Sequence, residues 1–194
     1  MNYGELRTLF SDLLNRNDCS DTLADTFISM GLRRVERLLR TPIQTSTFTK
    51  TIDNTWTGFE PIPTDYLGVK TISVNNIPVP RITWSQAQDG GGWIIKGGGF
   101  FFYPDLKEGD TLRVDYYNEF LRGVADDAIT DYSSVLTDVT VYAALTYAGD
   151  YFIDERLDRW QATLSGLIQE VQLMADIDET SGGLQITPIG GGIV

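Results

Sequence analysis

The 194-residue chain contains no histidine and only one cysteine. Without histidine it has no imidazole to act as a general base, to complete a Ser-His-Asp triad or to bind a metal ion. A single Cys19 allows no disulfide within the chain, which is typical of a reducing compartment. No histidine is present to activate its thiol, so a nucleophilic role is disfavoured. The sequence therefore favours a protein that is not an enzyme and binds no cofactor.

Long apolar runs are also absent. No window approaches 18 uninterrupted apolar residues, and the first residues do not combine a basic segment with an apolar one. The composition, 42% apolar and 22% charged, is that of an ordinary globular protein. We therefore expect a soluble cytoplasmic product without a membrane span or a secretory signal.

Positive charge is scarce, with 15 basic side chains against 27 acidic ones and a net charge of −12. The excess is uneven, since residues 118–180 carry a net charge of −10, whereas residues 1–45 are neutral. This balance argues against a protein that wraps nucleic acid, which needs clustered cations. Two interpretations of the acidity stay open: solvated helix faces that keep the chain soluble, or a surface that must not hold a polyanion.

Helical periodicity predicts two helices at the start of the chain. Apolar residues recur at the helical period between Tyr3 and Asn15, and again from Leu23 to Leu39 before Pro42. On the second helix, polar residues that include Glu36 are expected on the face opposite the apolar stripe. Four arginines gather near its end: Arg33, Arg34, Arg37 and Arg40. They suit a solvated last turn, where cations favour the helix dipole, or a contact with an acidic neighbour.

Residues 46–117 show the alternation and the turn residues of strands. The expected strands are 47–52, 67–74, a third led by Val79 and Ile82, a hairpin of 93–96 with 100–103, and a last strand at 112–116; residues 56–64 are expected as an edge or a loop. Asn75-Asn76 is expected as a tight turn. The glycine triplets at 90–92 and 97–99 do not match a phosphate-binding loop, so they are interpreted as strand turns.

Two long helices are predicted next. From Val135 to Ile153 the sequence is apolar almost all round, which places that helix at the centre of a bundle or against another subunit. Asp154-Glu155 opens the next helix, whose stripe runs from Leu157 to Met174 and whose end is marked by Asp176, Asp178 and Glu179. The fold class is thus α+β: a helical bundle from residues 1–45 and 118–180, a strand-rich insertion at 46–117, and a flexible tail at 181–194.

The tail carries five glycines, no charge and several aliphatic residues. A merely solvated tail would be expected to carry charge, so this composition favours docking on a partner subunit by strand addition or insertion. The alternative is a tail that folds back on its own domain.

The best catalytic candidate is the acidic set Asp126, Asp127 and Asp131. Paired carboxylates can bind Mg²⁺ or act as acid and base, which would suit a small metal-dependent hydrolase. However, the spacing is not that of an EF-hand, and aspartates in loops commonly cap helices.

In its order of elements the chain resembles the head-to-tail adaptor of short-tailed bacteriophages, the group that includes tail tubular protein A. Three stretches carry the resemblance. Residues 62–67 (IPTDYL) are similar to the family's entry into a central strand, and 102–117 to its strand, proline turn, strand and double tyrosine. Residues 138–151, with the acidic break at 154–156 and Trp160, are similar to its apolar helix and last helix. A head- or tail-completion protein of a longer-tailed phage is the structural alternative.

The resemblance implies a structural virion protein at the head–tail junction, assembled in the host cytoplasm. Such adaptors form a ring, commonly twelve-fold, beneath the portal protein; they extend the DNA channel and carry the tail nozzle and fibres. DNA would pass without specific binding, and acidic residues would line the lumen, with Asp150, Asp154 and Asp158 as candidates. The tail would reach the portal through its apolar residues and proline: Leu184, Ile186, Pro188, Ile189, Ile193 and Val194.

Overall fold

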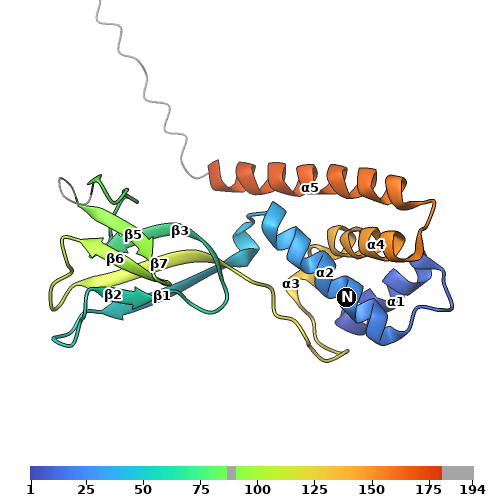
Figure 1. Cartoon of the computed structure of the whole chain (residues 1–194), viewed down its shortest axis with the longest axis horizontal. Coiled ribbons are helices and arrows are strands. Elements are labelled where there is room, and N and C mark those ends of the chain that lie inside the picture. Colours follow the sequence, from blue (N-terminus) through green and yellow to red (C-terminus); the bar gives the residue numbers. More distant parts are fainter. Residues whose placement is uncertain (87–90, 181–194) are drawn as a thin grey trace, which may run out of the picture. The chain divides into compact units, whose positions relative to one another are not determined.

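The computed structural model describes residues 1–86 and 91–180, with side chains described up to Ile177, so the tail predicted at 181–194 lies outside the described residues. Within these residues the protein is α+β, with five α-helices and two antiparallel sheets, which confirms the predicted fold class. The chain divides into two units (Figure 1). A helical unit contains Met1–Pro42 and the chain from Phe120 onward, and a strand unit contains Ile43–Glu119.

The first two helices, α1 (Tyr3–Leu14) and α2 (Asp21–Leu38), confirm the prediction for this region. Helix α1 begins with a capping box, in which the Asn2 side chain accepts a hydrogen bond from the Glu5 N–H and the Glu5 carboxylate accepts one from the Asn2 N–H. The Ser20 hydroxyl caps the start of α2 by accepting a hydrogen bond from the Leu23 N–H. These side chains satisfy N–H groups that have no partner within the helix, so each helix has a defined start.

Helix α4 (Thr137–Phe152) is the centre of the helical unit. It packs against α2 on one side and against α5 on another, and Val139, Val141 and Leu145 are almost completely buried. This arrangement confirms burial on more than one side and places the helix within the bundle. The expected start at Val135 is wrong: a separate short helix, α3 (Asp131–Ser134), ends there, and Val135 lies on the link with 63% of its surface exposed.

Helix α5 (Leu157–Thr180) buries one stripe, as predicted, but not along its whole length. Trp160 and Leu164 are buried, and in the second half the inward position is taken by Ala175. Met174, expected on the stripe, is 69% exposed. Position 175 lies about three helical turns after the buried Leu164 and therefore on the same face, whereas position 174 is turned away from that face by about 80°. Among the described residues, no helix is both long and apolar enough to cross a membrane.

The strand unit consists of two antiparallel sheets that follow a short 3-10 turn at Pro42–Gln44. The larger sheet has the order β1-β7-β3-β4, with β1 (Thr45–Thr51), β7 (Thr111–Asn118), β3 (Tyr66–Val74) and β4 (Ile77–Pro78). The smaller sheet has the order β2-β6-β5, with β2 (Phe59–Pro61), β6 (Gly99–Tyr103) and β5 (Gly92–Lys96). Buried residues from both sheets, together with Ile52 directly after β1, form one core: Ile52, Ile72, Trp93, Phe100, Phe102, Leu112, Val114 and Tyr116.

The strand expected from Val79 and Ile82 does not form. Only β4 pairs with β3, and the chain after it meets β5 at a single isolated bridge between Arg81 and Trp93. Pro78 and Pro80 have no N–H to donate, so a longer ladder cannot be built through this segment. The prediction for residues 56–64 is confirmed, since β2 is a three-residue edge strand.

Both tight turns predicted from glycine and asparagine are confirmed. Gly97 and Gly98 join β5 to β6 with φ values of 58° and 83°, and Asn75 and Asn76 join β3 to β4 with φ values of 51° and 65°. Positive φ at both central residues gives the twist that a two-residue hairpin requires. The second glycine triplet is therefore part of a hairpin and not of a phosphate-binding loop.

Candidate functional site

Two of the three aspartates considered as a metal or acid–base site have other roles in the structure. Asp126 forms an ion pair with Arg7, with 2.6 Å between a carboxylate oxygen and Nη2, and Asp131 begins α3 behind the Thr130 cap. In the part of the chain that the structure describes, no group of three or more acidic, cysteine or histidine side chains could hold a metal ion. The geometry therefore does not gather Asp126, Asp127 and Asp131 into a metal site.

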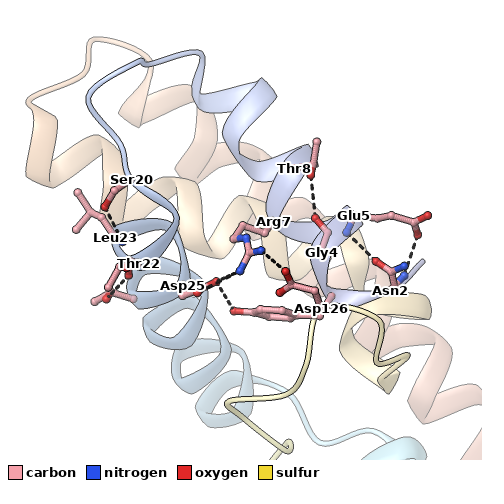
Figure 2. A network of polar contacts seen from close by, with 12 residues as sticks. Asn2, Gly4, Glu5, Arg7, Thr8, Ser20, Thr22, Leu23, Asp25 and Asp126 are labelled. Carbon is pink, nitrogen blue, oxygen red and sulfur yellow. Dashed lines mark hydrogen bonds and ion pairs between the residues drawn. The ribbon is translucent and has the colours of Figure 1, made fainter.

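Arg7 instead joins three segments of the helical unit (Figure 2). Its guanidinium lies 3.3 Å from the Asp25 carboxylate on α2 and 2.6 Å from Asp126 in the segment before α3. The Tyr3 hydroxyl donates a hydrogen bond of 2.9 Å to Asp25. Burial and the Asp25 carboxylate raise the pKa of Tyr3, so the phenol remains a donor at neutral pH. This cluster, which the sequence did not reveal, is a structural joint.

Cys19 also lacks the surroundings of a reactive thiol. It is a free, half-buried cysteine in the connection between α1 and α2. Burial raises the pKa of the thiol, and the neighbouring Asp18 and Asp21 raise it further. Because the thiolate is the nucleophilic form, Cys19 is protonated and weakly reactive at neutral pH.

The turn between α4 and α5 is held by Arg156. Its guanidinium donates hydrogen bonds to the carbonyl of Leu14, at 2.8 Å, and to the Asp154 carboxylate, at 2.7 Å. The Arg156 side chain also lies over the Trp160 ring, 4.7 Å from its centroid. The hydrogen bonds from Arg156 lower the pKa of Asp154 to about 2. Arg156 therefore joins the start of α5 to the end of α1, and the Asp154 side chain that pairs with it is only 8% exposed.

Replacing Asp154 with asparagine should lower the free energy of unfolding by about 1–2 kcal/mol at pH 7, because the charge that pairs with Arg156 is lost. The folded-state pKa of Asp154 lies below the value of an unfolded chain. The stabilisation is therefore complete above about pH 4 and is lost as the pH falls towards 2. Urea unfolding of wild type and Asp154→Asn between pH 7 and pH 2 measures this, and a difference that stays constant over that range would contradict it.

The other two candidate lumen residues differ from Asp154. Asp150, in the last turn of α4, and Asp158, in the first turn of α5, are both exposed. The structure thus places the three aspartates around one turn of the helical unit, with two carboxylates exposed and one paired with Arg156. Only the two exposed carboxylates can meet solvent or a passing polyanion directly.

The same turn exposes apolar side chains that the sequence analysis did not single out. Tyr151 is 64% exposed, and Ile153 is 93% exposed in a left-handed conformation with φ of 52°. That conformation at the end of a helix is usually occupied by glycine, so a β-branched residue there is unfavourable for the isolated chain. In the sequence, this unusual turn could have been noticed because no glycine stands between α4 and α5. Exposed apolar residues of this kind are typical of an interaction surface.

Glu36 corrects the expected polar face of α2. It was placed opposite the apolar stripe, but it is 2% exposed and points into the helical unit. Its carboxylate accepts a 2.7 Å hydrogen bond from the Phe120 N–H and pairs with the Arg122 guanidinium. The two residues of this ion pair are 86 positions apart in the sequence, so no local pattern predicts it. Glu36 fixes α2 to the segment where the chain re-enters the helical unit.

The four arginines near the end of α2 divide into two pairs. Arg34 donates a hydrogen bond to the Thr146 hydroxyl on α4, and Arg40 donates to carbonyls at the end of α2. The latter contact agrees with a cation at the negative end of the helix dipole. Arg33 and Arg37 point outward and are exposed.

The comparisons with known proteins identify one family. The family model described as SU10 adaptor protein matches residues 1–187, which include both units and part of the tail. A search of curated proteins found no match.

Proposed function

The chain belongs to the SU10 adaptor protein family, and we propose that it forms a dodecameric ring beneath the portal protein and extends the DNA channel there. Family membership makes it a bacteriophage adaptor, a structural component of the virion that associates with other head–tail proteins. The match over residues 1–187 is the observation that carries the proposal, because it covers the helical unit, the strand unit and part of the tail. The tail nozzle and the tail fibres would attach to this ring.

The lumen of the ring must let DNA pass without holding it. Fixed negative charge repels phosphate, and residues 118–180 contain 13 acidic side chains against three arginines. We assign this role first to Asp150 and Asp158, because they are exposed. Asp154 would contribute less to the lumen, since its charge is paired with Arg156.

The tail is proposed to dock on the portal. Residues 181–194 have no charged side chain and contain aliphatic residues spaced by glycine and proline. An extended apolar segment can insert between partner subunits or add to their sheets. The docking residues would be Leu184, Ile186, Pro188, Ile189, Ile193 and Val194.

Deleting residues 182–194 should leave a folded protein that is incorporated into portal-bearing particles at least about tenfold less than wild type, because the apolar contacts are removed. Thermal unfolding checks the fold, and the amount of protein bound to purified particles measures incorporation. A matched control changes only Gln185 and Thr187 to serine, which keeps the apolar residues and should bind normally. Normal incorporation of the truncated protein would refute the role of the tail.

A further inference from the structure

Two exposed stripes on the helical unit have opposite charge. On α2 the stripe contains Met30, Arg33 and Arg37, at positions i, i+3 and i+7, and it is exposed along its length. On α5 the stripe contains four residues at positions i, i+3, i+4 and i+7: Glu170, Leu173, Met174 and Ile177. Both spacings place the side chains on one face of a helix.

Neither stripe is neutralised by its own helix. Between Thr26 and Pro42 the acidic residue of α2 is Glu36, and it is buried against Phe120 and Arg122. After Arg159, near the start of α5, the sequence contains no further basic residue, so the part of α5 around Glu170 has no cation to offset it. One stripe is therefore apolar and basic, and the other is apolar and acidic.

The α5 stripe is too apolar for a surface that stays in water. Leu173 is 62% exposed, Met174 69% and Ile177 55%, although they lie within two turns of one helix. On α2, Met30 is 40% exposed and Leu38, next to Arg37, is 50% exposed. Apolar residues gathered in this way, with charges at their edge, are typical of protein interfaces.

We propose that the α2 stripe of one copy docks on the α5 stripe of a second copy. The inference rests on the ring proposed above and names the faces that would meet in it. Two different faces of the same chain give a head-to-tail contact, and such contacts repeated around an axis close into a ring. The apolar side chains would be buried, and Glu170 would lie among the guanidinium groups of Arg33 and Arg37, which fixes the orientation of the two helices.

The test reverses the charge of each stripe in the full-length protein. The α2 variant is Arg33→Glu with Arg37→Glu, and the α5 variant is Glu170→Lys with Met174→Lys; both pairs are spaced by four residues and exposed. Sedimentation velocity over concentrations up to millimolar measures self-association. Each variant alone should associate at least about tenfold more weakly than wild type, because like charges then face each other.

An equimolar mixture of the two variants should recover association. The reversed α2 stripe of one variant then meets the reversed α5 stripe of the other, and the two unchanged stripes also meet. The matched control, Lys107→Glu with Arg159→Glu, makes the same change in net charge as the α2 variant at exposed positions outside both stripes, and it should associate as wild type does. Circular dichroism verifies that each variant is folded.

Three outcomes overturn the inference: a wild-type chain that stays monomeric at millimolar concentration, single variants that associate as wild type does, or a mixture that fails to recover. The adaptor role is tested separately by the particle-binding experiment on the tail. If both charge variants form rings on portal-bearing particles, the adaptor role stands and the pairing of these two faces is wrong.

Discussion

Replacing Gly31 with alanine should destabilise the helical unit by about 2–3 kcal/mol, because α2 and α4 touch through their backbones at this position. A Cβ atom on Gly31 would lie 2.7 Å from the Ala144 nitrogen and 3.0 Å from the Ala143 carbonyl carbon. Neither atom can rotate away as the end of a long side chain could. Chemical unfolding followed by circular dichroism measures the loss, and Gly31→Val should unfold at a still lower denaturant concentration.

Gly166→Ala is the matched control for this prediction. Gly166 lies inside α5, and an added Cβ would meet nothing within 4 Å. The same chemical change should therefore stabilise the protein by about 0.5–1 kcal/mol, since alanine has the higher helix propensity. If both substitutions raised stability, the close crossing of α2 and α4 at Gly31 would be wrong.

The sequence predicted the helices well because their apolar periodicity is a local property. The all-apolar pattern of α4 indicated the centre of a bundle or a contact with another subunit, and the structure shows the first. The prolines at positions 61 and 63 correctly limited residues 56–64 to an edge strand. Periodicity does not say how closely two helices approach. Gly31 lies within a clear helical pattern, and the small residues Ala143 and Ala144 allow its backbone to touch α4. That relation joins residues more than 100 positions apart, so no local pattern carries it.

The wrong predictions for single residues have the same cause, because burial depends on contacts between segments that are distant in the sequence. Val135 and Met174 are apolar and stand close to a helical period, yet each is exposed because none of the elements that the structure describes covers it. The prediction for Glu36 was wrong in the opposite direction: its charge suggested exposure to solvent, but it is buried against partners more than 80 residues away in the sequence. Counting charges located the acidity in residues 118–180, but Asp150 and Asp158 were named as lumen candidates only through the family resemblance. The pairing of Asp154 could not be predicted, because it depends on where Arg156 points.

Replacing Glu36 with alanine should have the largest effect on stability, a loss of about 3–5 kcal/mol. Removing the carboxylate leaves the Phe120 N–H without its 2.7 Å acceptor and removes one charged partner of the Arg122 guanidinium, whose side chain is 22% exposed. A buried donor or charge that loses its partner costs far more than the contact itself contributes. Equilibrium unfolding in urea measures the loss.

Two further variants show how much of this loss of stability comes from the charge of Glu36 and how much from its buried position. Glu36→Gln keeps an oxygen for the Phe120 N–H, so its loss of stability should be about 1–2 kcal/mol smaller than that of Glu36→Ala. Glu170→Ala makes the same chemical change at an exposed site of α5 and should alter stability by less than about 0.5 kcal/mol. Equal effects of alanine at positions 36 and 170 would show that Glu36 does not fix α2 to the returning chain. Arg33 and Arg37 lie on the outward side of the same helix. A loss of stability on replacing Glu36 would therefore assign the fold to the inner face of α2, whereas its outer face is proposed to bind the next copy.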